Sequence, residues 1–273
     1  MNASYLIRRL KTGLHNKWWL LNYKLRSLGI KLQFYWLLYA GSKRLDLSQK
    51  SALVFAPHQD DETLGCGGII ALKREQAVPV NVVFVTDGGG SHKGNSKITR
   101  EDIVQIRKQE ALTALNILGV ESKDVHFLNK CDGALHKMTE AEQQQTIEEM
   151  AQLLGDFQPQ EVYVTHSKDR SPDHETTYQL VTKAIALAGI KVDLWQYAIW
   201  LLWESLVFRD LKLEELTGAY QLGIHKVQSK KEQAIKTYRS QYLPIDAEST
   251  DTVLPANFLW RFFLPHEVFF KTD

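Results

Sequence analysis

The sequence predicts an α/β fold: a Rossmann-like, doubly wound and mostly parallel sheet with helices on both faces. Short apolar runs of strand length alternate with longer segments of helical periodicity along the middle of the chain. Chemically active side chains directly follow two of these runs, at the carboxyl ends of strands where open α/β sheets place their ligands. The chain has 273 residues, 44% hydrophobic and 24% charged, which is long and apolar enough to bury such a core.

The first predicted core strand is the apolar run Leu53–Ala56, which Pro57 ends. Three glycines follow, Gly65, Gly67 and Gly68, and then an apolar-periodic segment. Clustered glycine before such a segment is typical of a tight turn that leads into a helix. We therefore expect a turn over the glycines and a helix over residues 68–75.

The remaining elements continue the alternation. Further strands are predicted at residues 80–86, 125–128 and 161–166, and helices at 100–118, 140–154 and 174–188. From Trp195 the pattern changes: residues 195–201 alternate like a strand, 220–224 form a strand and 227–242 a helix. The aromatic stretch 258–263 either closes over the site or covers the N-terminal segment.

The first fifty residues form a separate basic amphipathic segment, and residues 51–273 form the α/β domain in this interpretation. Residues 1–50 carry ten Lys and Arg and one acid, a formal charge of +9, whereas the rest of the chain sums to −8. A helical apolar stripe runs between the basic residues. Its members are Ile7, Leu10, Leu14, Trp18, Leu21, Leu25, Leu28 and Leu32. Residues 1–32 are predicted either to lie on an anionic membrane surface or to pack on the protein's own core or a second subunit.

The composition limits the expected cellular compartment and the classes of binding partner. Two cysteines, Cys66 and Cys131, give no disulfide framework, and a reducing, cytoplasmic location with peripheral membrane contact is expected. The sequence has no apolar segment of the roughly 18 residues that a membrane span needs. A nucleic-acid partner is not predicted, because the basic segment is amphipathic rather than groove-reading. No oligomeric state is predicted.

The loop after the first strand carries metal-binding chemistry. His58, Asp60, Asp61 and Glu62 lie within five residues. Adjacent carboxylates repel one another, and a divalent metal supplies the compensating charge. An imidazole and a carboxylate suit zinc, whose catalytic sites use three protein ligands. The alternative is a solvated acidic turn.

A second loop, Thr165–His174, also follows a predicted strand and precedes a helix. It therefore belongs at the same edge of the sheet as His58, and His174 could supply a ligand from outside the first loop.

At these two loops the sequence resembles a known family. PHQDDETLGCGG (residues 57–68) resembles the PHPDDExLGxGG signature of the PIG-L/LmbE-like zinc-dependent de-N-acetylases, the N-acetylglucosaminyl-phosphatidylinositol de-N-acetylase family, with Gln59 in place of proline. Ser171-Pro172-Asp173-His174 resembles the family's HPDH signature, with serine for the first histidine. Weaker matches extend the resemblance over residues 51–242. They are Arg107–Glu110 followed by Leu118-Gly119-Val120, and Lys231, Ala234 and Arg239-Ser240-Gln241.

The resemblance implies roles for individual residues. The zinc ligands would be His58, Asp61 and His174, and Asp60 would be the general base. In relatives the first histidine of HPDH is credited with polarising the carbonyl or protonating the leaving amine. Because Ser171 cannot act as a general acid at neutral pH, His166, Asp173 or zinc alone would take over that work.

The implied function is a zinc-dependent hydrolase that removes an N-acetyl group from an N-acetylglucosamine-type sugar in a glycoconjugate, small or lipid-linked. The alternative is a non-catalytic or differently specific relative: a glycan-binding module or a hydrolase of another amide. A nucleotide-binding Rossmann protein is disfavoured, because the glycine spacing is not GxGxxG and the acidic loop would repel a pyrophosphate.

Overall fold

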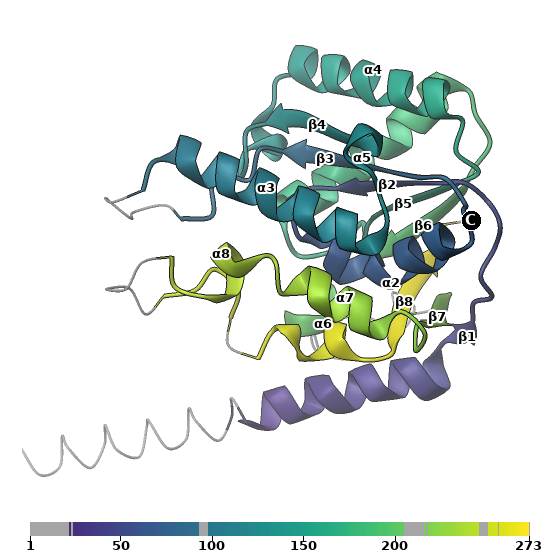
Figure 1. Cartoon of the computed structure of the whole chain (residues 1–273), viewed down its shortest axis with the longest axis vertical. Helices are drawn as coiled ribbons and strands as arrows, with labels where there is room; N and C mark the ends of the chain where they lie inside the picture. Colours follow the sequence, from purple (N-terminus) through teal and green to yellow (C-terminus); the bar gives the residue numbers. More distant parts are fainter. Residues whose placement is uncertain are drawn as a thin grey trace, which may run out of the picture.

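A computed structural model describes residue 22 and residues 24–92, 98–204, 216, 218–245, 251–255 and 257–272. Within these residues the strands form one sheet of eight, in the order β1-β7-β8-β6-β5-β2-β3-β4 (Figure 1). The strands are β1 (Lys43–Arg44), β2 (Ala52–Ala56), β3 (Val80–Thr86), β4 (Val125–Lys130), β5 (Glu161–Thr165), β6 (Asp193–Tyr197), β7 (Ala219–Gly223) and β8 (His266–Lys271). The helices are α2 (Asp61–Glu75), α3 (Arg100–Leu118), α4 (Glu140–Phe157), α5 (Pro172–Ala188), α6 (Leu201–Glu204), α7 (Gln228–Ile235) and α8 (Arg239–Tyr242).

The sheet is mostly parallel, as predicted. Strands β4, β3, β2, β5 and β6 pair in parallel, with β2 at the centre. The last strand, β8, comes from the end of the chain and pairs antiparallel with β6 and β7. No strand was predicted at β8, whose four consecutive buried residues, Glu267–Phe270, lack the alternation of a half-buried strand.

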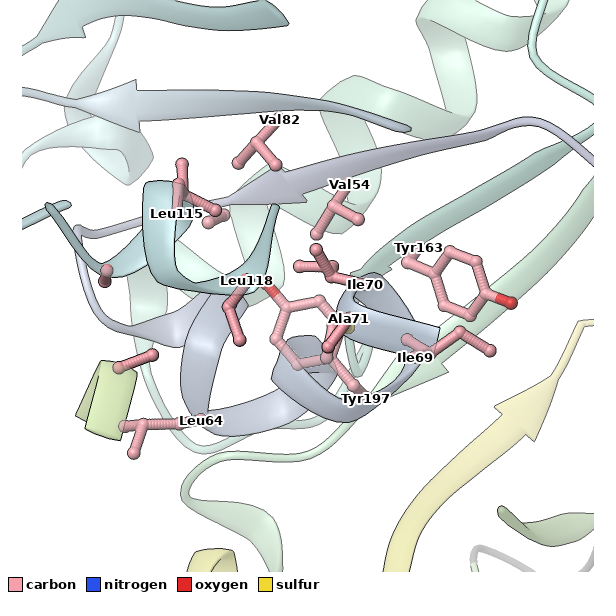
Figure 2. Packing of buried hydrophobic residues seen from close by; sticks show 14 of the residues in the cluster. Val54, Leu64, Ile69, Ile70, Ala71, Val82, Leu115, Leu118, Tyr163 and Tyr197 are labelled. Atoms are coloured by element: carbon pink, nitrogen blue, oxygen red, sulfur yellow. The ribbon is translucent and has the colours of Figure 1, made fainter. Parts of the chain in front are cut away.

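Helices cover both faces of the sheet, as a doubly wound fold requires. On one face, Val54 packs in a core with residues of α2, α3 and α7; on the other, Leu53 and Phe55 pack in a core with residues of α4 and α5. Successive residues of β2 point to opposite faces, so this one short strand contributes to both cores. Figure 2 shows Val54 and Val82 of the sheet beside Ile70, Leu115 and Leu118 of the helices that cover the first face.

Helix α2 begins earlier than predicted, and this displaces the expected turn. It starts at Asp61, so Gly65, Gly67 and Gly68 lie inside the helix. The glycines are needed for close packing: a Cβ atom on Gly65 would lie 2.2 Å from Cδ2 of Tyr197. The prediction of a tight turn over the glycines was therefore wrong, because glycine serves here for interhelix and helix–sheet contact rather than for a turn.

Several boundaries were predicted closely. β3 and α3 have the predicted ends, and a capping box at Thr99 and a left-handed Gly119 (φ 91°) terminate α3. The strand predicted at 195–201 corresponds to β6, which ends at Tyr197. Leu201, the last residue of the predicted strand, is the first residue of α6. The predicted helix at 227–242 is two helices, α7 and α8, interrupted near Tyr238.

The N-terminal helix, which we define as residues 24–41, lies along one side of the molecule (Figure 1). Residues 24–36 are helical and continue as a π-helical turn, Leu37–Gly41. Its inner face, including Phe34 and Leu37, packs in a third core cluster with residues of β7, β8 and α6. Trp260 contacts Phe34 edge to face at 5.5 Å, so the aromatic stretch 258–263 covers the N-terminal segment, one of its two predicted roles.

The described leucines of the predicted apolar stripe are exposed rather than buried. Leu25, Leu28 and Leu32 are more than half exposed, and Ile7 to Leu21 lie outside the described residues. No helix in the described ranges is long and apolar enough to cross a membrane.

Candidate active site

A cavity of about 410 Å³ opens at the carboxyl ends of the parallel strands. The loop after β2 contributes His58, Asp60 and Asp61, and the first turn of α5, after β5, contributes Asp173 and His174. The structure therefore brings the two predicted loops together at one edge of the sheet.

Three donor atoms at the base of the cavity form a nearly equilateral triangle. His58 Nδ1 lies 3.2 Å from Asp61 Oδ2, and His174 Nε2 lies 3.3 Å from each of these two atoms. Asp61 and His174 are buried, and His58 is partly exposed toward the cavity. Two imidazole nitrogens and one carboxylate oxygen at this spacing are a donor set that could hold one metal ion.

Each imidazole of the triangle presents its other nitrogen to a carboxylate. His174 Nδ1 lies 2.7 Å from Asp169 Oδ2, and His58 Nε2 lies 3.1 Å from Asp132 Oδ1. Asp169 is fully buried and also accepts hydrogen bonds from the backbone amides of Ile199, Trp200 and Leu201, at the start of α6. Such outer carboxylates fix the tautomer and orientation of metal-binding histidines.

Sequence reasoning missed both outer carboxylates. Asp169 lies inside the second loop, and Asp132 follows β4 at the same edge of the sheet as the predicted ligands. Asp132 could have been predicted from its position shortly after a parallel strand. Asp169 could not, because the sequence gives no reason to choose it over Asp173 in the same loop.

The charge balance at the triangle favours a bound cation. Burial would lower the pKa of His58, but contacts with Asp132, Asp173 and Asp61 raise it well above its usual value. Burial alone would raise the pKa of Asp61, whereas His174 and His58 lower it. Three carboxylates around one imidazole are an excess of negative charge, which a divalent cation would neutralise.

Asp60 lies beside the triangle but is not part of it. Its Oδ1 accepts a hydrogen bond from Arg107 Nη2 at 3.1 Å, and its backbone amide donates to Glu62 Oε2. Its φ of 145° is one that L residues rarely adopt, and such strain persists where neighbouring contacts over-determine the backbone. Burial, with the adjacent Asp61, raises the pKa of Asp60 to about 7, against the opposing effect of Arg107.

Asp173 ties a loop to the first turn of α5. Its Oδ2 accepts from the Gly133 amide at 2.7 Å, and its Oδ1 accepts from the Leu135 amide at 3.1 Å. The same Oδ1 lies 3.8 Å from Nδ1 of His136, which lines the cavity. His136 is a cavity residue that the sequence analysis did not single out.

Ser171 lies at the cavity, whereas His166 packs elsewhere. Ser171 lines the cavity as the residue before α5. The His166 amide donates to the Tyr197 carbonyl, which continues the β5–β6 pairing, and the His166 ring packs edge to face on Phe270 at 4.9 Å. His166 Nδ1 accepts from the Lys168 amide, and His166 is not among the described residues that line the cavity.

Comparison with known proteins gives this geometry a context. The family model described as PIG-L: GlcNAc-PI de-N-acetylase matches residues 53–185. The probable N-acetyl-alpha-D-glucosaminyl L-malate deacetylase 2 of Bacillus anthracis is 32% identical over 146 residues, which are 51% of this chain and 61% of that protein. The 4-oxalmesaconate hydratase of Pseudomonas putida is 29% identical over 151 residues, 54% of this chain and 55% of that protein. The chain thus spans less than two thirds of the length of these relatives.

A solved structure shares the fold. The N,N'-diacetylchitobiose deacetylase of Pyrococcus horikoshii superposes with a TM-score of 0.56 and 22% identity, covering 79% of this chain and 80% of that one. The family match begins within β2 and ends within α5, so it contains both loops that form the donor triangle. Residues 53–185 therefore form a domain of the PIG-L, GlcNAc-PI de-N-acetylase family.

Proposed function

We propose that the protein is a zinc-dependent hydrolase that removes the N-acetyl group from an N-acetylglucosamine-type sugar in a glycoconjugate. The observation that carries the proposal is the triangle of His58, Asp61 and His174 at the base of a sugar-sized cavity. The deacetylase name of the Bacillus anthracis relative supports the reaction type.

Zinc fits the donor set. Zinc–nitrogen and zinc–oxygen bonds of about 2.0–2.1 Å in tetrahedral geometry place neighbouring donors about 3.3 Å apart. The three donor separations here are 3.2, 3.3 and 3.3 Å. Zinc bound by these residues would polarise an amide carbonyl and stabilise negative charge on its oxygen.

Asp60 is the proposed general base. Arg107 holds its Oδ1, which leaves Oδ2 to take a proton from the water molecule that attacks the acetyl carbonyl carbon. The new carbon–oxygen bond forms, the carbon–nitrogen bond breaks, and the nitrogen gains a proton. The products are acetate and a free amino sugar.

His136 is the proposed proton donor to the leaving nitrogen, with the negatively charged Asp173 as its neighbour in the cavity. Among the described cavity residues it is the one imidazole outside the donor triangle. Its Nδ1 lies 3.8 Å from Asp173 Oδ1, which is beyond a direct hydrogen bond but close enough for the carboxylate to attract a protonated ring. This assignment replaces the expectation for His166, whose ring packs on Phe270.

The cavity lining suits a sugar with an apolar and a polar side. Trp200 and Leu254 supply apolar surface, and Gln241 supplies an amide for hydrogen bonding to hydroxyl groups. We propose that the substrate is a small-molecule or lipid-linked glycan conjugate that presents an N-acetylhexosamine here.

A second candidate is a different reaction on the same scaffold, since one relative is named as a hydratase. The described lining contains four aspartates, namely Asp60, Asp61, Asp132 and Asp173. The same lining also contains Arg107 and Arg170, and a bound divalent cation would offset two further negative charges, so the charge of the lining does not separate an anionic substrate from a neutral N-acetyl sugar. We prefer the deacetylase because the Bacillus anthracis relative is named as one and is more similar to this chain than the hydratase is.

The test is acetate release from a panel of N-acetylhexosamine conjugates, measured with the zinc-loaded protein, after chelation and after zinc is restored. The proposal predicts equal amounts of acetate and free amine, lost on chelation and regained with zinc. Absence of acetate across the panel, with hydration of 4-oxalmesaconate instead, would support the second candidate.

A further inference from the structure

The N-terminal helix, residues 24–41, presents an apolar outer face to solvent; in the described structure Tyr35 contacts Trp260 and Tyr39 contacts His266 at its border. Eight large hydrophobic side chains are exposed among the described residues, and six of them belong to this helix. They are Leu25, Leu28, Leu32, Tyr35, Trp36 and Tyr39. We propose that this outer face docks on an anionic lipid surface.

The helix has two distinct apolar faces. Ile30, Phe34, Leu37 and Leu38 are buried against the third core cluster. The six exposed residues recur at steps of three, four and one, and at 3.6 residues per turn they cover one side of the helix, opposite the buried residues. An ordinary surface helix needs only the inner face, so the outer face has a different role.

The protein's own core cannot cover the outer face. The inner face is fixed by burial, with Leu37 and Leu38 fully inaccessible, and by the edge-to-face contact of Phe34 with Trp260. Rotating the outer leucines inward would expose these residues. The occupant of the outer face must therefore come from outside the described core.

Charge identifies the occupant. Residues 24–41 contain Lys24, Arg26 and Lys31, all exposed, and no acidic residue. Lysine and arginine beside an apolar stripe attract anionic headgroups, and exposed tryptophan and tyrosine prefer the boundary between headgroups and acyl chains. A second copy of the same helix would bring like charges together, so the lipid surface is favoured over self-association.

The sequence upstream supports the same inference. Ile7, Leu10, Leu14, Trp18 and Leu21, outside the described residues, continue the spacing that places Leu25, Leu28 and Leu32 on the outer face. Four further cations, Arg8, Arg9, Lys11 and Lys17, lie in the same stretch. The interface inferred from the described helix thus continues in the sequence pattern.

Co-sedimentation of the full-length protein with vesicles tests the proposal. The vesicles are phosphatidylcholine alone, or phosphatidylcholine with phosphatidylserine. We expect binding to the second kind, weakened but not abolished when salt is raised from about 0.1 M, where charges are screened over about 10 Å, to several times that value. Leu25→Gln/Leu28→Gln/Leu32→Gln should lower the partition coefficient at least tenfold.

The matched control is Leu187→Gln/Leu243→Gln, which changes two exposed leucines on other parts of the surface and should bind vesicles like the wild type. Should the triple variant fail to fold by circular dichroism, Lys24→Gln/Lys31→Gln provides the second test, since it should reduce the preference for phosphatidylserine. Wild-type binding by the folded triple variant, or an unchanged phosphatidylserine preference in the charge variant, would overturn the proposal. So would a dimer in analytical ultracentrifugation that the triple variant dissociates, with no vesicle binding by the wild type. None of these readouts depends on deacetylase activity.

Discussion

At the scale of single residues, the site separates the work of adjacent carboxylates by their surroundings. Asp61 faces two imidazoles, whereas Asp60 faces Arg107 and is held in an unusual backbone conformation. The two side chains of one dipeptide thus point to different partners. This supports a metal ligand and a base as neighbours in the sequence.

Asp60→Asn is the first prediction. The amide keeps the size of the side chain but cannot take a proton, so turnover should fall by about 10²–10⁴-fold, the usual contribution of a general base. Zinc content should stay at the wild-type level, because Asp60 is outside the donor triangle. Turnover and bound zinc are measured on the same preparation, and near-normal turnover would contradict the assignment.

The second prediction compares variants of His136 and His166. His136→Gln should lower kcat by about 10²–10⁴-fold, because the cavity imidazole is the proposed proton donor. His166→Gln should retain turnover, since its ring packs on Phe270. Ser171→His, added to His136→Gln, should restore part of the rate, because residue 171 lines the same cavity. Loss of turnover in the His166 variant alone would reverse the assignment.

At the scale of elements, helix α2 shows how packing sets the position of the site. Asp61 is its first residue, and Gly65, one turn later, lies against the buried ring of Tyr197. The Tyr197 hydroxyl donates to the Phe55 carbonyl at 2.9 Å, which fixes the ring against β2. The helix can approach the sheet this closely only because residue 65 has no side chain, and that approach places Asp61 near His174.

The third prediction follows from this contact. Gly65→Ala should lower the free energy of unfolding by about 1–3 kcal/mol, as overpacked cores do, and should weaken zinc binding by shifting Asp61. Gly155→Ala in α4 is the matched control, because a Cβ atom there has no neighbour within 4 Å. That change should stabilise the protein by about 0.5–1 kcal/mol through helix propensity. Urea unfolding measures both, and equal effects would contradict the packing argument.

The ends of some elements could be predicted from the sequence, whereas the start of α2 could not. The ends of β3 and α3 could be predicted because periodicity, a capping threonine and Gly119 act locally. The start of α2 could not be predicted, because glycine is required at residue 65 by the close approach of Tyr197, which is far away in the sequence. Likewise, His58 and Asp61 carry a local motif, whereas His136 and Asp169 become site residues only through the loops that the fold brings together.

At the scale of the whole molecule, the site depends on segments from most of the chain. The parallel strands deliver the two loops of the triangle, and the segment before α6 supplies the amides that hold Asp169. Strand β8, from the end of the chain, buries Glu267, which accepts from the Gly68 and Ile69 amides of α2 and pairs with Lys231 of α7. The family match over residues 53–185 thus contains the ligands, but not all of the structure that positions them.

A bound metal should therefore stabilise the whole fold, which is the fourth prediction. At a free metal concentration of 100 times Kd, binding contributes about 2.7 kcal/mol to the free energy of unfolding. For a domain of this size that corresponds to a rise in Tm of roughly 5–10 °C. Differential scanning calorimetry with zinc and with chelator should show this difference for the wild type and none for His174→Ala.

The most direct test of the account is the zinc content of the purified wild type and of His174→Ala, with folding verified by circular dichroism. His225→Ala, which changes an exposed histidine outside the cavity lining, is the matched control. The account predicts that the wild type and His225→Ala each bind one zinc ion per chain, and that His174→Ala is folded but has lost the zinc. Full zinc occupancy in folded His174→Ala would contradict the account.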